Sequence, residues 1–203
     1  MSAHLCGWLE AAGWLGLQLR LGIGGDRERE RIEVIIGNLL MMCRTEFAAG
    51  LAHERLSKLA PSSSITDSLT RCADAHALLV SAHQAWATLE ELGRLLRAGS
   101  FAQKAVLKAL RTHRPVMRRC ETARDHIEHV TERLGRGRSI HFGRGKTMTA
   151  KVFRQSIGAV TQRTITFGNE SFDLAEQIAA LTSTRKMVAP AITAAATPQM
   201  RGT

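Results

Sequence analysis

The sequence is poor in aromatic side chains and has no tyrosine. Only 4% of its 203 residues are aromatic, namely 6 Phe and 3 Trp. The absence of tyrosine excludes regulation by tyrosine modification. With so few aromatic rings, we also expect base stacking to contribute little to any nucleic-acid binding.

Cysteines and long apolar runs are scarce as well. The 4 Cys lie far apart and form no C-x-x-C pair, a pattern typical of reduced thiols in a cytoplasmic protein. The apolar N-terminus is interrupted by Glu10, Gln18 and Arg20, so it falls short of the roughly 18 uninterrupted residues of a membrane span. A basic segment typical of a signal peptide is also missing. We therefore expect a cytoplasmic protein that binds no membrane.

Acidic residues are rare in the C-terminal half. From Arg94 to the end the chain has 20 basic and 7 acidic residues, whereas residues 1–93 have 8 basic and 11 acidic ones. Such a basic half attracts phosphates, and RNA is the partner we expect; the alternative is a solubilising surface. The candidate phosphate contacts come from two stretches without any acid: Arg111, Arg114, Arg118, Arg119, Arg136, Arg138, Arg144 and Lys146.

Helical periodicity is the strongest positive signal. Apolar residues at three- and four-residue steps predict a first helix from Asp26 and a second one that ends at Gly99. Ser100 is placed to cap a third helix that stops before Pro115, and Pro115 suits the first turn of a fourth. The predicted apolar stripe of the first helix comprises Ile32, Ile35, Ile36, Leu39, Cys43, Phe47 and Leu51.

The pattern changes after Gly135. Alternating, β-branched residues at Arg163–Phe167 predict a strand, residues 171–174 a short return strand, and Asp173 is placed to cap a last helix. We expect a mainly α fold, a bundle of long helices with a small C-terminal β-hairpin and helix appendage. The predicted parts are an extension at 1–25, the bundle at 26–136, the appendage at 137–188 and a disordered tail at 189–203.

One helical segment carries a candidate site. Arg124-Asp125-His126-Ile127-Glu128-His129, on the predicted fourth helix, resembles the signature of the HEPN superfamily, the higher eukaryote and prokaryote nucleotide-binding domains. The resemblance implies a HEPN-like helical homodimer that cleaves RNA without a metal ion or cofactor. It also implies that Arg124 stabilises charge on the scissile phosphate, that His129 handles the proton of the ribose 2′-hydroxyl and that Asp125 orients the pair.

The helix geometry adds a condition to this hypothesis. At about 100° per residue, Arg124 and His129 point about 140° apart, so a second surface must cover the pair. A homodimer packed along this helix would provide one. Toxin–antitoxin or phage-defence ribonucleases are the functions that the resemblance suggests, and an antidote protein would then be a further partner.

Two other interpretations stay open. The first is a non-catalytic basic bundle that binds nucleic acid or a protein partner, with Arg124 and His129 as ordinary surface residues. The second is a metal-binding bundle, in which His76 and His83 would meet His126 and His129. We expect no metal site, because metal-binding bundles normally supply Glu-x-x-His pairs from two helices and the sequence has none.

Overall fold

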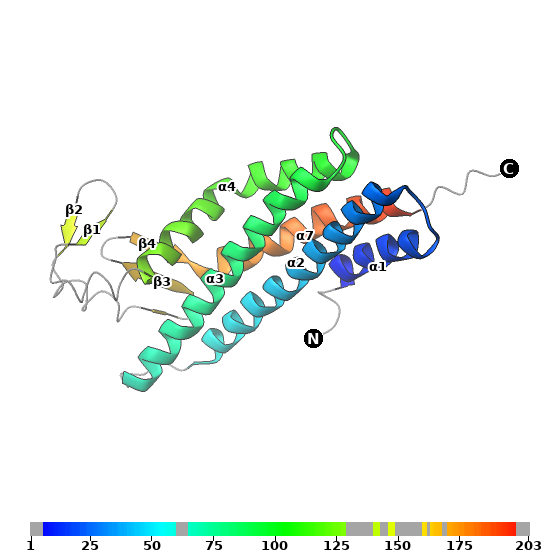
Figure 1. Ribbon diagram of the computed structural model, residues 1–203. Helices are drawn as coiled ribbons and strands as arrows, with labels where there is room; N and C mark the ends of the chain where they lie inside the picture. Colours follow the sequence, from blue (N-terminus) through cyan, green and yellow to red (C-terminus); the bar gives the residue numbers. More distant parts are fainter. Residues whose placement is uncertain are drawn as a thin grey trace. The chain divides into compact units, whose positions relative to one another are not determined.

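The protein is described from a computed structural model, for residues 6–59, 65–128, 140–142, 146–148, 160–161, 163–167 and 170–197. Within these residues the chain forms five helices and two hairpins (Figure 1). This confirms the mainly α class predicted from the sequence. The elements are α1 (Cys6–Arg20), α2 (Asp26–Lys58), α3 (Ile65–Leu95), α4 (Phe101–Glu128), β1 (Ile140–Phe142), β2 (Lys146–Met148), β3 (Thr164–Phe167), β4 (Glu170–Asp173) and α7 (Leu174–Ala196).

The chain divides into two compact units that do not follow its order. Unit 1 comprises residues 1–47, 84–115 and 179–203, and unit 2 comprises residues 48–83 and 116–178. Each of α2, α3, α4 and α7 contributes residues to both units.

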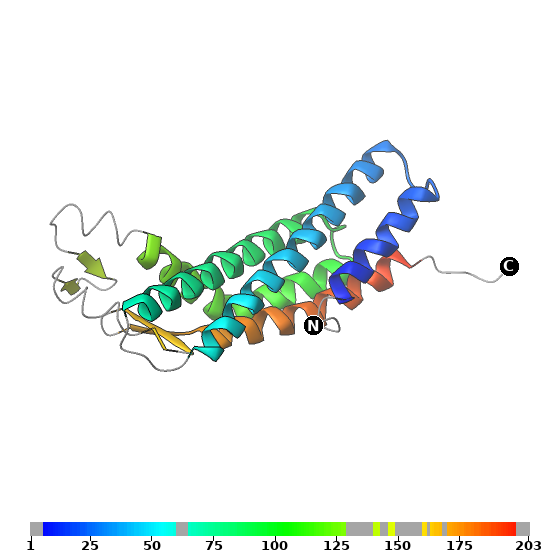
Figure 2. The same ribbon diagram turned by 90° about the horizontal axis from the view of Figure 1, so that it is seen from below.

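In unit 1, helix α1 occupies residues for which the sequence predicted only an extension. Trp8, Ala11, Ala12 and Leu15 recur at the spacing of one helical face and are buried. The indole nitrogen of Trp8 donates a 2.9 Å hydrogen bond to Glu46 on α2, and the Gln18 amide donates one of 2.6 Å to the Ala196 carbonyl on α7. Accordingly, α1 lies beside α2 and α7 in both ribbon views (Figures 1 and 2).

The C-terminal helix also extends beyond its predicted end. The sequence predicted a disordered tail from residue 189, but α7 continues to Ala196 with Pro190 inside it. Pro190 is exposed, whereas Val188, Ala189, Ala191, Ile192 and Ala196 are buried in unit 1. Burial of this apolar side stabilises the last turns and offsets the helix hydrogen bond that proline cannot make.

A second proline, Pro115, lies inside α4, where the sequence predicted a break between two helices. Two helices were predicted to meet at Pro115, yet α4 is one helix from Phe101 to Glu128. The buried residues before and after Pro115 lie on the same side of the helix, at helical spacing without a shift, and Pro115 itself is exposed. The predicted cap is confirmed: the Ser100 hydroxyl accepts a 3.1 Å hydrogen bond from the Gln103 amide, after Gly99 with a positive φ of 74°.

Helix α2 buries a different side from the one predicted over its second half. Ile32, Ile35, Leu39 and Cys43 are buried as expected, but Phe47 and Leu51 are each 39% exposed. The core positions there are Glu46, Ala49 and Ala52. Among the described helices, only α2 is long and apolar enough to cross a membrane by length and composition, and less than half of its apolar stretch is buried.

Unit 2 contains both hairpins. Strand β3, close to its predicted bounds, pairs antiparallel with β4, and the buried Ile165 and Phe172 face each other in the register. The Asp173 carboxylate then caps α7 by accepting a 2.8 Å hydrogen bond from the Ala175 amide, as predicted. The hairpin of β1 and β2, in which Ile140 pairs with Met148, was not predicted from the sequence.

Candidate functional site

Two neighbouring residues of the predicted motif form an ion pair in unit 2. Arg124 and Asp125 follow each other near the end of α4, and Nη2 of Arg124 lies 2.7 Å from Oδ1 of Asp125. The Arg124 Nε also donates to this oxygen, at 3.3 Å. The Arg124 side chain is 22% exposed and the Asp125 side chain 45%. The guanidinium is thus held in place while both partners keep contact with solvent.

The thiol one turn before Arg124 is structural. Cys120 is buried and donates a hydrogen bond to the Leu79 carbonyl at 3.4 Å. Burial raises the pKa of Cys120 to about 12, although the Arg124 charge acts in the opposite direction. A thiol with this pKa stays protonated at neutral pH and cannot act as a nucleophile. Cys120 is therefore not a candidate nucleophile beside Arg124.

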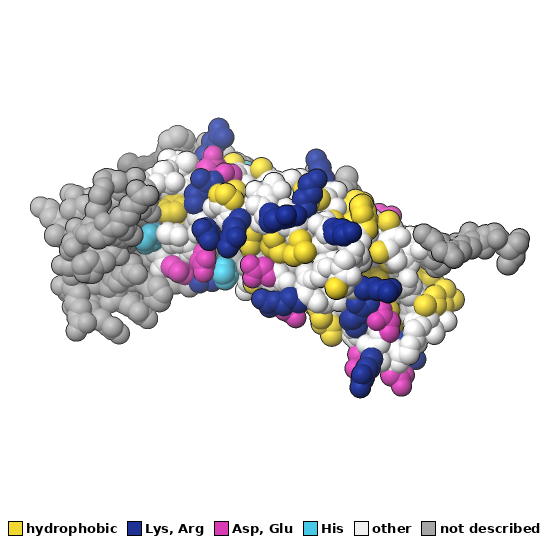
Figure 3. All heavy atoms as spheres, turned by 90° about the horizontal axis from the view of Figure 1, so that it is seen from above, with side chains coloured by type: hydrophobic (Ala, Val, Ile, Leu, Met, Phe, Trp, Pro, Cys, Tyr) yellow, Lys and Arg dark blue, Asp and Glu magenta, His cyan; other side chains and the backbone are white. Residues whose placement is uncertain are grey.

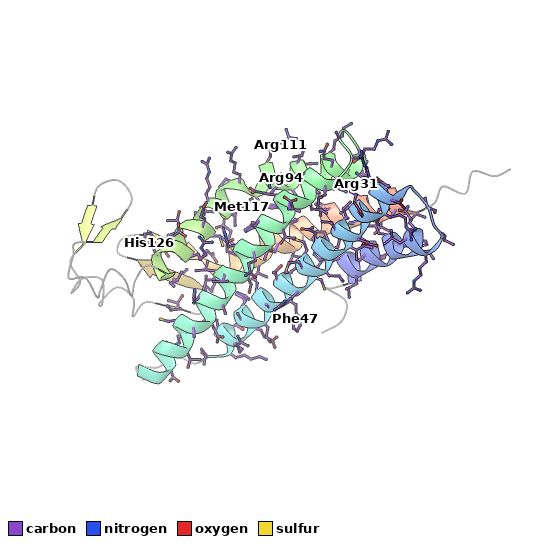
Figure 4. The ribbon with its side chains drawn as sticks, in the orientation of Figure 1. Arg31, Phe47, Arg94, Arg111, Met117 and His126 are labelled. Atoms are coloured by element: carbon purple, nitrogen blue, oxygen red, sulfur yellow. The ribbon has the colours of Figure 1, made fainter. Side chains whose placement is uncertain are left out.

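His126 lies in the core of unit 2. Its side chain is 7% exposed, and its ring centre is 6.2 Å from that of Phe172 on β4. Figure 4 shows it near the end of α4. In the sequence, His126 was considered as a ligand of the alternative metal-binding bundle. Because it is buried against an aromatic ring, we assign it a packing role.

Most of the remaining predicted site residues follow α4 in the sequence. His129, the predicted proton-transfer residue, lies outside the described residues, as do Arg136, Arg138 and Arg144. Lys146 begins β2, where its backbone pairs with Phe142. For the motif, the structure thus brings together Arg124 and Asp125.

A group of basic residues stands on the exposed side of α4 in unit 1. Lys104, Lys108, Arg111 and Arg114 are all exposed, and at about 100° per residue they fall within an arc of about 120°. We call these four residues the α4 cation face. Figure 3 looks onto a side where Lys and Arg side chains are prominent, and in Figure 4 Arg111 points away from the helix.

The α4 cation face is free of ion pairs within the described part of the chain. None of its four residues forms a salt bridge there, although Nε of Arg111 donates a long hydrogen bond to the Leu107 carbonyl. Arg111 and Arg114 were candidate phosphate contacts from the sequence. Lys104 and Lys108 were not, even though they lie in the same acid-free stretch, and helical phase was the signal that would have identified them.

The remaining predicted contacts of α4 lie in unit 2 and differ from each other. Arg118 and Arg119 are both exposed. Arg119 forms an ion pair with Glu176 at the start of α7, so part of its charge is compensated. Among the described residues Arg118 has no such partner, which leaves it the more available of the two for a phosphate.

Unit 1 also holds a buried ion pair, between Glu46 and Arg185. Their atoms Oε1 and Nη1 are 2.9 Å apart, and the side chains are only 10% and 8% exposed. The second oxygen of Glu46 accepts the hydrogen bond of Trp8. Because both carboxylate oxygens are used inside the core, this pair connects α1, α2 and α7 and is not a candidate for chemistry on a substrate.

The described residues contain no group of three or more His, Cys, Asp or Glu side chains that could hold a metal ion. His76 lies on α3 in unit 2, and its Nε2 is buried without a hydrogen-bond partner in the described part of the structure.

No protein-family model, curated protein or solved structure matches the chain.

Proposed function

We propose that this protein binds RNA through the α4 cation face. The observation that carries the proposal is the exposure of four cations on one side of a helix, without an ion-pair partner in the described residues. From Lys104 to Arg114 the helix rises about 15 Å, long enough for contacts to several successive phosphates. Unpaired cations release counterions on binding, which favours a polyanion.

The alternatives are a solubilising surface and an acidic protein partner. An RNA ligand differs from both in its salt dependence, because each phosphate contact with a single strand contributes about 0.7 to the slope of log affinity against log salt. Aromatic residues are scarce, so we expect weak sequence preference. A short, fluorescently labelled single-stranded RNA in an anisotropy titration is a suitable probe.

The decisive comparison uses two double variants of equal charge change. In Lys108→Gln with Arg111→Gln the salt slope should fall by about 1.4, the value for two lost phosphate contacts. The control, Arg20→Gln with Lys186→Gln, removes two exposed cations of unit 1 outside the α4 cation face and should change the slope little. Equal effects of the two variants, or wild-type protein that binds no RNA, would contradict the proposal.

The Arg124–Asp125 ion pair supports a finer proposal, a metal-independent endoribonuclease. Asp125 holds the Arg124 guanidinium, where it would stabilise negative charge on a scissile phosphate. The ribose 2′-oxygen would attack the adjacent phosphorus and lose its proton to a base. As the bond between phosphorus and the 5′-oxygen breaks, that oxygen takes up a proton. The products would be a cyclic phosphate end and a 5′-hydroxyl end, with His129 as the proposed proton carrier.

A further inference from the structure

Helix α2 presents an apolar surface to solvent within unit 1. Val34, Leu40, Met41 and Phe47 are between 39% and 49% exposed, and Figure 4 shows Phe47 pointing away from the helix. At about 100° per residue they form two strips, Leu40 with Phe47 and Val34 with Met41, about 120° apart on the helix, and exposed apolar surface of this kind marks interaction sites.

A glycine forms a notch in this surface. Gly37 is exposed in the middle of α2, and a Cβ added there would meet nothing within 4 Å. Among the described residues no packing contact therefore requires glycine at this position, although glycine weakens a helix interior relative to alanine. Glycine does allow another helix to approach closely. Leu40, 48% exposed, follows it one turn later on the same face.

Charges of opposite sign flank the notch. Glu33 and Arg44 are exposed, and the spacing of positions 33, 37, 40 and 44 places them on the same face as Gly37 and Leu40. Neither charge forms an ion pair within the described residues. They are separated by about 16 Å along the helix.

This arrangement is complementary to itself. If two copies of α2 pack antiparallel, a two-fold axis between residues 38 and 39 places Glu33 opposite the partner's Arg44 and Gly37 opposite the partner's Leu40. This one axis therefore creates two contacts between Glu33 and Arg44 and two contacts between Leu40 and Gly37, each between different copies. Symmetric dimers use such isologous contacts, in which one surface patch meets its own copy.

We propose that the α2 face formed by Glu33, Gly37, Leu40 and Arg44 is a self-association surface, which binds a second copy of this chain antiparallel. The proposal does not depend on RNA binding. It places the dimer contact on α2, a different surface from the α4 helix favoured by the sequence. The contact predicted from the sequence lies on the segment after Pro115, the unit 2 half of α4, and stays a prediction.

The surface of one helix pair is small, so the dimer should be weak and concentration-dependent. Sedimentation velocity at low salt, from low micromolar to several hundred micromolar full-length protein, measures it directly. Wild-type protein should shift from monomer to dimer across this range. Leu40→Glu should abolish the shift, whereas Leu107→Glu, on the exposed side of α4, should leave it unchanged.

A charge-swap experiment tests the register and avoids ambiguity from misfolding. Glu33→Arg alone and Arg44→Glu alone each place like charges opposite each other, so both variants should stay monomeric. An equimolar mixture should dimerise as the wild type does, because each Arg then faces a Glu of the other variant. Since the mixture restores the interaction, loss in the single variants cannot be attributed to unfolding.

Three outcomes would overturn the proposal. The first is wild-type protein that stays monomeric at several hundred micromolar. The second is a mixture of the two charge variants that fails to dimerise although the wild type does. The third is a monomer that floats with phosphatidylcholine vesicles and loses this binding in Leu40→Glu, because that result would assign the α2 face to lipid.

Discussion

Units 1 and 2 differ in one buried ion pair and in the grouping of their unpaired cations. In unit 1 the pair of Glu46 and Arg185 is buried, while the α4 cation face stands in solvent without ion-pair partners among the described residues. In unit 2 three arginines whose side chains are between 22% and 51% exposed pair with acids: Arg55 with Asp74, Arg119 with Glu176 and Arg124 with Asp125. The two units therefore suit two different proposed tasks. The α4 cation face of unit 1 suits RNA binding, and the Arg124 guanidinium of unit 2, held by Asp125, suits catalysis.

The largest expected effect concerns chemistry in unit 2. If the protein cleaves RNA, His129→Ala should remove proton transfer and lower the rate about a hundredfold to ten-thousandfold. Arg124→Ala should cause a loss of similar size because charge stabilisation is removed. Both rates are measured from the cyclic phosphate product on a labelled RNA, with chelator present, under which wild-type activity should persist.

A matched control for these variants is Thr122→Ala. Thr122 is exposed on α4 and should leave the rate unchanged. His126→Ala is unsuitable as a control because His126 is buried and its removal would disturb the core. Purified wild type and His129→Ala with equal activity would end the catalytic proposal and leave an RNA-binding bundle. Variants of the α4 cation face should bind RNA more weakly but cleave each bound RNA at the wild-type rate. This result would support binding by unit 1 and chemistry by unit 2.

The next largest effect concerns the buried pair of unit 1. Arg185→Met should destabilise the fold by about 3–5 kcal/mol, because it leaves the Glu46 carboxylate buried without its cation. Arg119→Met, which breaks an exposed pair of unit 2, should cost only about 0–1 kcal/mol. Urea unfolding followed by circular dichroism measures both.

Replacing both partners tests the cause of this difference. Glu46→Leu combined with Arg185→Met removes the uncompensated charge and should recover much of the loss. Equal costs for Arg185→Met and Arg119→Met would contradict the contrast between a buried and an exposed pair.

The smallest effect is a pH dependence of unit 1. Burial lowers the pKa of His113 below its ordinary value of 6.5, and its ring lies 6.1 Å from that of Trp86. Below pH 6.5 the unfolded chain therefore takes up a proton that the folded chain resists, so stability falls as the pH falls towards the lowered pKa. Thermal unfolding should show this loss when it is measured from about pH 5 to about pH 7.5, an interval that brackets the ordinary pKa of histidine.

His113→Phe isolates the contribution of this residue, because phenylalanine keeps a ring beside Trp86 and cannot be protonated. The variant should lose less stability than the wild type on acidification. The other histidines titrate in both proteins, so their effect cancels in the difference. Identical pH profiles for the two proteins would show that His113 is equally solvated in the folded and unfolded chain.

Local signals in the sequence predicted much of the secondary structure. The cap at Ser100, the end of a helix before Gly99 and the cap at Asp173 depend on neighbouring residues, and the structure confirms all three. The candidate pair of Arg124 and Asp125 was also found locally, since adjacent residues on a helix are close in any fold. His129 stays a prediction, because it lies outside the described residues.

The exposed and buried sides of α2 needed information from far along the chain. Its sequence alone favours burial of Phe47, but Glu46 is buried in its place. A carboxylate is stable in a core only with partners for its charge and hydrogen bonds, and these come from Trp8 on α1 and Arg185 on α7. The sequence by itself therefore determined the long helices in outline, the caps at Ser100 and Asp173 and the basic excess, but not α1 or the continuation of α4 through Pro115. Only the tertiary structure decided which charges are buried and which apolar side chains remain in solvent, because both depend on contacts between distant segments.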